Sequence, residues 1–171
     1  MASYQTPISA IVKGALAGAA GTWVMSKAME RVPSLLRETG VPLPKAPRSP
    51  TGSKTPTEEV ADGLAEAGEV GPLDEDERAT AGQAIHWGYG AAWGAVYGIM
   101  QSSLRLPHII IGTLFGALVG SVADTVMPRL GLQTSPAGRP PSLTVLYMSY
   151  HLIYGWATAL AWAILNLGRR G

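Results

Sequence analysis

The sequence contains no cysteine among its 171 residues, and only 15% of the residues are charged. The lack of cysteine excludes disulfide bonds, thiolate metal sites and a cysteine nucleophile, and it leaves the redox compartment open. Carboxylates are confined as well, because all twelve acidic residues except Glu30 and Asp124 lie between Glu38 and Glu77. Low charge, 21 glycines and a positive mean hydropathy are together typical of a membrane protein.

Motifs of hydrolytic and nucleotide-dependent chemistry are also missing. The chain has no GxSxG nucleophile elbow, no HExxH zinc motif, no P-loop, and no basic patch that would suggest nucleic acid. Since only two carboxylates lie outside the acidic stretch, the sequence offers little for nucleophilic or acid–base catalysis. We therefore do not expect an enzyme.

Four apolar segments approach or exceed the length of about 20 residues that spans a bilayer. They cover residues 8–31, 75–103, 108–128 and 143–167. The second segment is expected to begin in water, where Asp74 and Glu77 form the pattern of a capping box, and to enter the membrane near Gly82. The pattern predicts an all-α polytopic membrane protein with four transmembrane helices in a single domain of residues 1–171.

Residues 33–73 form a long connection of unusual composition. Prolines at positions 33, 42, 44, 47, 50 and 56 predict an extended surface loop that begins near Val32 and has VPLPKAPRSP (41–50) as its core. A solvated linker, a cap over the helix ends and a docking strip for a partner all fit this composition. From Thr57 to Ala67, early acids and one apolar face predict a short interfacial helix. That face comprises Val60, Ala61, Leu64 and Ala65.

Two offsets in the sequence indicate an internal repeat. The HxxYG pattern of His86, Tyr89 and Gly90 returns 65 residues later as His151, Tyr154 and Gly155. The first and third segments align at an offset of 98, which pairs Gly14 with Gly112 and Gly18 with Gly116. These offsets predict two similar helical hairpins related as a parallel repeat. Chance similarity between glycine-rich helices is the alternative.

Glycines at a spacing of four residues predict close helix packing, since small residues let helix backbones approach one another in a membrane. They are Gly14, Gly18, Gly90, Gly94, Gly98, Gly112, Gly116 and Gly120. Such glycine seams serve packing within the chain or docking of another subunit, and both alternatives stay open at this point.

A polar cluster is predicted at the end of the bundle that carries the two long loops. His86 and His151 are expected at equal depth, about 9 Å from the midplane, and the third helix brings Asp124 to the same layer. Ionisable residues in membrane helices usually face a bundle interior or an aqueous cavity. The candidate set also includes Tyr89, Tyr154, Lys27 and Glu30.

Three interpretations of this cluster compete. In the first, neutral histidines tie the hairpins together through hydrogen bonds. In the second, the imidazoles ligate a haem, a chlorophyll-type pigment or a metal ion. In the third, the cluster is a proton or small-solute pathway. His108, which follows Pro107 in a short turn, is expected to be a solvated loop histidine.

Positive charges predict the orientation of the chain. Seven lysines and arginines, Arg129 and Arg139 among them, flank helix ends on the long-loop side, against four on the other side. This distribution favours cytoplasmic long loops.

The order of elements resembles that of a known family. A glycine-rich first helix, VPLPKAPRSP, the HxxYG helix, GTLFGALVG (112–120), GLQTSP (131–136) and a last helix with His151 are similar to the YagU-like family of small bacterial inner-membrane proteins, whose function is uncharacterised. The resemblance implies a multi-pass helical bundle in the bacterial inner (plasma) membrane, and it supplies no catalytic residues.

We therefore expect a structural or accessory subunit of a larger membrane complex, with the His86/His151 layer near the cytoplasmic face. The alternatives are a small proton or small-solute transporter or channel, and a haem- or pigment-binding subunit. The expected partners are the lipid bilayer, other membrane subunits or a second copy, and no nucleic acid.

Overall fold

The computed structural model describes residues 6–42, 52, 54–104 and 106–167. Within these residues the chain forms five α-helices and one short 3₁₀ helix, and it has no strand. The helices are α1 (Pro7–Glu38), α2 (Pro56–Ala67), α3 (Glu75–Leu104), α4 (His108–Arg129), η1 (Pro136–Gly138) and α5 (Pro141–Leu165). The predicted all-α class is confirmed.

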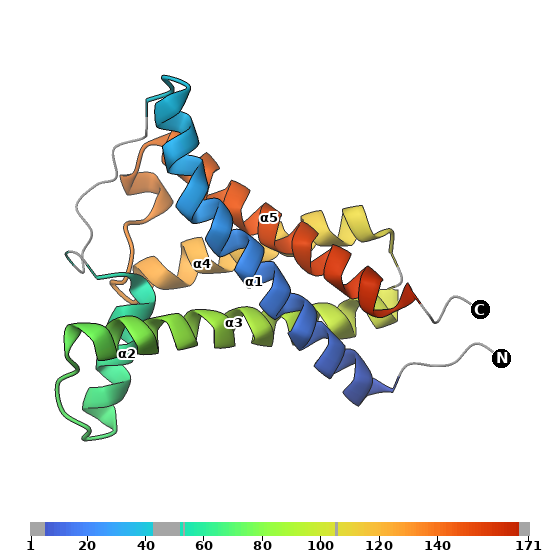
Figure 1. The fold of residues 1–171 in the computed structure, drawn as a ribbon, viewed down its shortest axis with the longest axis horizontal. Coiled ribbons are helices and arrows are strands. Elements are labelled where there is room, and N and C mark those ends of the chain that lie inside the picture. The colour runs from blue at the N-terminus through green and yellow to red at the C-terminus, as the bar shows by residue number, and fades with distance from the viewer. Residues whose placement is uncertain (1–5, 43–51, 53, 105, 168–171) are drawn as a thin grey trace.

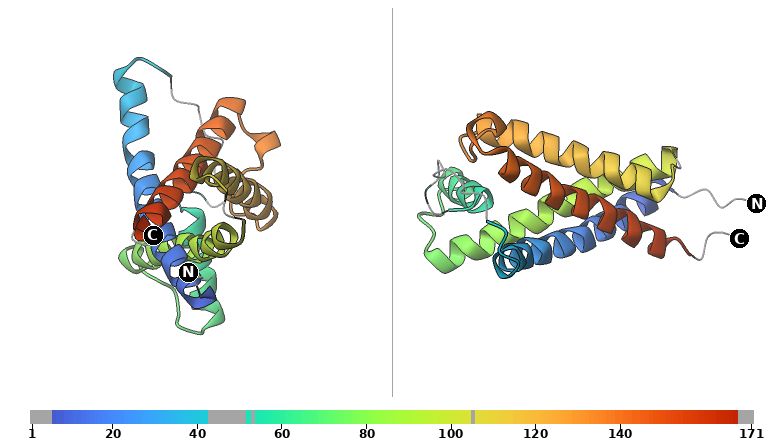
Figure 2. Two further views of the ribbon diagram at one scale, coloured as in Figure 1. Left: turned by 90° about the vertical axis from the view of Figure 1, so that its right-hand side faces the viewer. Right: turned by 90° about the horizontal axis from the view of Figure 1, so that it is seen from above.

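The four long helices run alternately in opposite directions. The start of α1 and the end of α5 therefore lie at one end of the molecule, where Lys13 Nζ donates a hydrogen bond of 2.9 Å to the carbonyl of Leu165 (Figure 1). Helix α2 and the segment between α4 and α5 lie at the opposite end (Figure 2). Helix α1 packs against α3 and α5, α4 packs against α5, and α2 lies on α3.

Glycines line the contact between α1 and α3. A Cβ added to Gly94 would lie 2.5 Å from the Cα of Gly18, and one added to Gly14 would lie 2.9 Å from the Cα of Gly98. Ordinary Cβ contacts are 3.4 Å or longer, so only glycine lets the two backbones approach this closely. This seam is filled within the chain.

A second glycine seam joins α4 to α5. Gly155 lies so close to Gly116 that an added Cβ would be 2.8 Å from its Cα. Gly18, which the offset of 98 pairs with Gly116, likewise meets Gly90, the HxxYG counterpart of Gly155. The structure thus decides between the two predicted uses of the glycines, because both seams serve packing within the chain.

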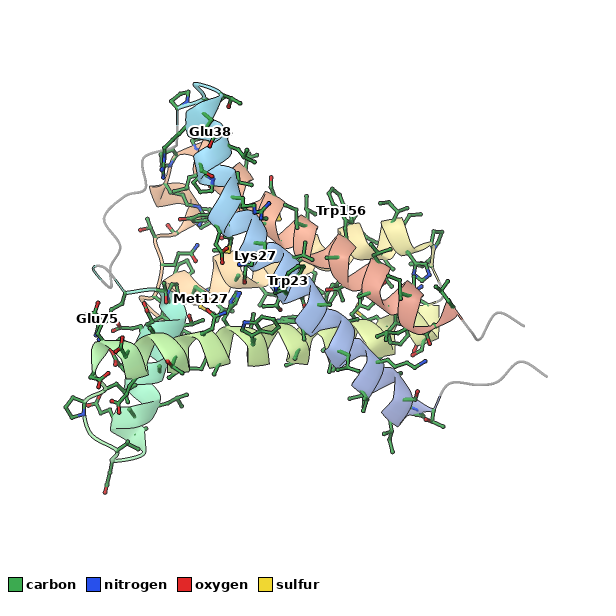
Figure 3. The ribbon with its side chains drawn as sticks, in the orientation of Figure 1. Trp23, Lys27, Glu38, Glu75, Met127 and Trp156 are labelled. Carbon is green, nitrogen blue, oxygen red and sulfur yellow. The ribbon has the colours of Figure 1, made fainter. Side chains whose placement is uncertain are left out.

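Large aromatic rings fill the centre of the bundle, while many other large apolar side chains face outward. Tyr97 and Phe115 are fully buried, with ring centroids 5.1 Å apart. Leu16 on α1 and Ile109 on α4 are 58% and 65% exposed. Trp23 and Trp156 also lie on the outside (Figure 3).

Among the described residues, two helices are long and apolar enough to cross a membrane by length and composition, namely α1 and α4. Helices α3 and α5 do not meet the same criterion. Tyrosine, tryptophan and histidine lower the mean hydropathy of both, and α3 begins with the acidic run Glu75-Asp76-Glu77.

The long connection begins later than predicted. Helix α1 continues through Pro33 to Glu38, so the expected helix end near Val32 is wrong. Proline removes one backbone donor without ending this helix, whose last residues, Leu35-Leu36-Arg37-Glu38, are strong helix formers. Of the predicted VPLPKAPRSP core, residues 43–50 lie outside the described residues.

The short helix predicted over residues 57–67 is confirmed as α2. Its buried residues, Ala61 and Ala65, belong to the predicted apolar face, but Leu64 is 61% exposed. The capping box before α3 is also present, because Glu77 N donates to Asp74 Oδ1 at 2.8 Å and Asp74 N donates to Glu77 Oε2 at 3.0 Å.

Candidate functional site

A cavity of about 850 Å³ opens at the end of the bundle where α2 and the α4–α5 connection lie. All five α-helices contribute to its wall. Of the residues predicted as a polar cluster, five line it: His86, Tyr89, Asp124, His151 and Tyr154. A volume of this size lies within the range of small-molecule sites.

His86 reaches the cavity from α3. Its Nε2 lies 3.4 Å from the Ser26 hydroxyl of α1, within hydrogen-bond distance. A hydroxyl donates or accepts, so this contact is compatible with either tautomer of the ring.

His151 reaches the same cavity from α5 and has a defined tautomer. Its Nδ1 lies 2.9 Å from the carbonyl oxygen of Tyr147. A carbonyl only accepts, so Nδ1 carries the hydrogen, and Nε2 of the neutral ring is left as an acceptor. A histidine that ligates a metal through Nε2 has its Nδ1–H held by an acceptor in the same way.

Asp124 is held by an arginine that the sequence reasoning had counted as a loop charge. Arg139 Nη2 donates to both carboxylate oxygens of Asp124, at 2.7 and 2.6 Å, and Arg139 Nε donates to Thr144 Oγ1 at 3.0 Å. The Arg139 side chain is 1% exposed, and its guanidinium carbon lies 4.7 Å from the Tyr147 ring centroid. The α4–α5 connection thus folds back into the bundle end. A signal was present, since an isolated carboxylate in a membrane helix needs a cationic partner.

Lys27 and Glu30 lie outside the cavity, which corrects their predicted place in the cluster. They pair with each other at 2.7 Å across one turn of α1, and their side chains are 47% and 59% exposed. The two residues lie at the predicted depth along the bundle, but their side chains are on the exposed face of α1.

The two tyrosines of the repeat have different environments. Tyr154 is 3% exposed, and its hydroxyl donates to the carbonyl of Gly90 at 2.7 Å, which links α5 to α3. Tyr89 is 40% exposed, and its ring lies edge-on to Trp93 with centroids 6.1 Å apart.

Helix α2 forms part of the cavity wall through Glu58. The Glu58 side chain lies over Gly82 of α3, and its carboxylate accepts a 2.6 Å hydrogen bond from Thr55 N in a capping box. The hydrogen bonds from the Thr55 backbone and side chain lower the pKa of Glu58 below its usual value. The carboxylate is therefore ionised at neutral pH.

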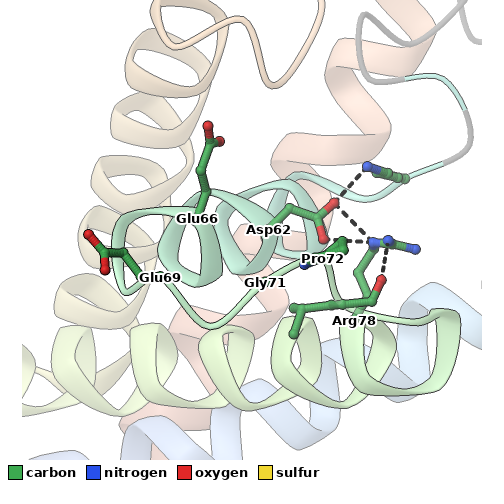
Figure 4. A pocket seen from close by; sticks show the side chains of 8 residues that line it. Asp62, Glu66, Glu69, Gly71, Pro72 and Arg78 are labelled. Atoms are coloured by element: carbon green, nitrogen blue, oxygen red, sulfur yellow. Dashed lines mark hydrogen bonds and ion pairs between the residues drawn. The ribbon is translucent and has the colours of Figure 1, made fainter.

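A second, smaller cavity of about 540 Å³ lies between α2, residues 69–73 and the start of α3 (Figure 4). Asp62 accepts from Lys54 Nζ at 2.6 Å and from Arg78 Nε at 2.8 Å. The Lys54 and Arg78 hydrogen bonds lower the pKa of Asp62, and the bond to Asp62 raises the pKa of Arg78. The Asp62–Arg78 pair fastens α2 to α3, and Lys54 joins the residues before α2 to the same carboxylate.

His108 was expected in a solvated loop, and that prediction is wrong. It begins α4, half-buried, with Nδ1 3.2 Å from Gln101 Nε2. This contact lies at the end of the bundle away from the large cavity.

The described part of the chain has no group of three or more histidine, aspartate or glutamate side chains placed to hold a metal ion. No protein-family model, curated protein or solved structure matches the chain. The fold and the cavity are therefore the observations on which a function rests, and the YagU-like resemblance stays a prediction.

Proposed function

We propose that this protein is a four-span integral membrane protein whose large cavity binds a small molecule close to one membrane surface. The observation that carries the proposal is the cavity itself, which brings His86 and His151 from separate helices to one wall together with the buried Asp124–Arg139 pair. Binding would be the first step of the small-solute transport that the sequence offered as an alternative.

The distribution of side chains by size supports the membrane-spanning part of the proposal. Helices meet through glycine, while exposed leucine, isoleucine, valine and tryptophan cover the outer faces. In water such a surface would aggregate, whereas in lipid it is favourable. Helix α5 has 25 residues and is therefore about 37 Å long, enough to span a bilayer.

The predicted duplication fits this architecture. Gly18 meets Gly90 in one pair of helices, and their counterparts Gly116 and Gly155 meet in the other. We propose that α1–α3 and α4–α5 are the two parallel repeats, and that the cavity lies between them where the HxxYG histidines converge.

The lack of native cysteine allows a direct test of the number of spans. Single cysteines would replace Leu64 on α2, Leu106 between α3 and α4, and Leu130 after α4, and a membrane-impermeant thiol reagent would label them in oriented vesicles. Four spans place Leu64 and Leu130 on one side and Leu106 on the other. If only α1 and α4 cross the membrane, Leu64 and Leu106 share a side instead, which would refute the proposal.

The same labels report orientation and localisation. We propose a bacterial inner-membrane protein with cytoplasmic long loops, following the family resemblance and the distribution of positive charge. Because Arg139 is buried against Asp124, the number of lysines and arginines that flank helix ends on the long-loop side falls from seven to six. This is still more than the four on the other side. Labelling of Leu64→Cys from the periplasm would overturn this orientation.

The binding role is tested by filling the cavity. Ala123 lines it, whereas Ala92 lies on the exposed face of α3. The purified protein should bind at least one member of a panel of cationic, neutral and anionic fluorescent probes. Ala123→Trp should abolish that binding, and Ala92→Trp should leave it unchanged. Equal binding by both variants would show that the probes occupy lipid or detergent rather than the cavity.

A haem- or pigment-binding subunit is a second candidate function, favoured by the tautomer of His151. With Nδ1–H held by the Tyr147 carbonyl, Nε2 is free to ligate a metal centre. A Soret or chlorophyll band in the natively purified protein, lost in His151→Leu, would support it, and a colourless protein would exclude both groups. The accessory-subunit role stays a prediction, and the glycine seams no longer argue for it, because both are filled within the chain.

A further inference from the structure

The charges on the wall of the large cavity do not cancel. Among the described residues that line it, the acidic and basic side chains other than histidine are Glu58, Asp124 and Arg139. Arg139 donates to both oxygens of Asp124, so these two charges compensate each other. Glu58 forms no ion pair with a described residue of the wall, so the wall carries a net negative charge of one apart from the histidines.

The surface beside the cavity has the same sign. Between residues 54 and 78, nine carboxylates face only Lys54 and Arg78, and both of these cations are already paired with Asp62. Such a field raises the local concentration of cations and disfavours anions. The acidic stretch is therefore more than a solvated loop, because its residues 55–58 and 60 form part of the cavity wall.

Aromatic rings provide the second element of recognition. Tyr89, Trp93, Tyr147 and Tyr150 line the cavity, and ring faces attract cations, most strongly where water is excluded. The wall already shows this interaction, since the Arg139 guanidinium lies over the Tyr147 ring at 4.7 Å.

An anion would find little to bind. The Nη1 atom of Arg139 has no hydrogen-bond partner in the described structure, but it is buried. The Tyr147 ring lies over one face of the guanidinium, and Asp124 occupies its Nη2 edge. The arginine of the wall is therefore already engaged by two partners of this chain.

From these observations we infer that the ligand is an organic cation, an ammonium- or phosphonium-type group on an apolar body. The apolar body follows from the volume of about 850 Å³ and from Met25, Met29 and Met127 in the wall. The inference rests on the proposed binding function and adds the chemical class of the ligand.

Two ions of nearly equal size and opposite charge provide the test. Tetraphenylphosphonium and tetraphenylborate, with neutral triphenylphosphine oxide as a third probe, would be titrated against the full chain in nanodiscs of zwitterionic lipid at low ionic strength. The phosphonium should bind more tightly than the neutral and anionic probes, and Ala123→Trp should abolish its binding.

A matched pair of variants isolates the charge. Glu58→Gln keeps the capping box, which accepts glutamine as well as glutamate, and should weaken phosphonium binding roughly tenfold. Glu59→Gln removes a charge from the next residue, which pairs with Lys54 at 3.8 Å and does not line the cavity, and should change binding less than about twofold.

The outcomes separate the two proposals. If the borate or the neutral probe binds as tightly as the phosphonium, and Ala123→Trp blocks it, the cation preference is refuted while the binding function stands. Equal effects of Glu58→Gln and Glu59→Gln would also refute the cation site. If none of the three probes binds in a manner sensitive to Ala123→Trp, the cation inference is refuted, and the wider probe panel then decides the binding function separately.

Discussion

Replacing Gly94 by alanine adds one methyl group to the closest approach between α1 and α3. The new Cβ would lie 2.5 Å from the Cα of Gly18, whereas ordinary contacts begin near 3.4 Å. The helices would therefore have to separate by about 1 Å. The three nearest atoms belong to the helix backbone of Gly14 and Gly18, so none of them moves aside as a flexible side chain would. Overpacking of this kind typically lowers the free energy of unfolding by about 1–3 kcal/mol. Because the surroundings are rigid, we expect Gly94→Ala to lower it by about 3 kcal/mol.

Gly88 provides the matched control on the same helix. A Cβ on Gly88 meets nothing within 4 Å, so Gly88→Ala should stabilise the helix by about 0.5–1 kcal/mol through its better helix propensity. Unfolding by SDS titration in mixed micelles, followed by tryptophan fluorescence, measures both variants. Equal stability of Gly94→Ala and Gly88→Ala would refute the packing of the α1–α3 seam described here.

Three further predictions follow from other contacts. Arg139→Leu leaves the buried Asp124 carboxylate without its cationic partner and should lower the free energy of unfolding by about 3–5 kcal/mol in the same titration. The double variant with Asp124→Leu should recover most of this loss. Full stability of the single variant would contradict the ion pair. Tyr154→Phe removes the hydrogen bond to the Gly90 carbonyl and should lower the free energy of unfolding by about 1 kcal/mol. Tyr89→Phe, at an exposed position, should leave it almost unchanged. Equal losses of stability in the two variants would argue against the link between α5 and α3. The pKa values of Glu58, in the α2 capping box, and of Asp62, bonded to Lys54 and Arg78, are lowered in the folded state, so their stabilisation of α2 is present above pH 4.5 and is lost as the pH falls through the lowered values. A spin label at Leu64→Cys should gain mobility in acid while one at Leu106→Cys does not, and unchanged mobility at Leu64 would refute the carboxylate anchoring of α2.

Local features were predictable because they depend on neighbouring residues in the chain. The capping box before α3, the short α2 helix and the end of α4 next to Pro128 follow from residues within a few positions of each other. The passage of α1 through Pro33 was missed for a related reason. Proline was given more weight than the run of helix formers after it, and a single lost hydrogen bond did not end the helix.

The candidate site was predictable only in part. Depth along a bundle follows from residue number, so His86, His151 and Asp124 were placed in one layer by counting. Direction around each helix depends on which neighbours it packs against, and this is where Lys27 and Glu30 were misplaced. Arg139 was missed because it lies in a connection, where sequence patterns carry no periodicity to show that the chain turns inward.

The sequence by itself determined that the chain is helical, rich in closely spaced glycines and nearly free of carboxylates outside one acidic stretch, since these properties are local or compositional. Only the tertiary structure decided which glycines meet, that both seams are filled within the chain, and that Asp124 is paired with Arg139 across 15 residues of sequence. It also placed the histidines of the two HxxYG motifs on the wall of one cavity with Glu58 of α2. The physical reason is that packing and ion pairing depend on distances between helices, whereas helix formation depends on residues a few positions apart.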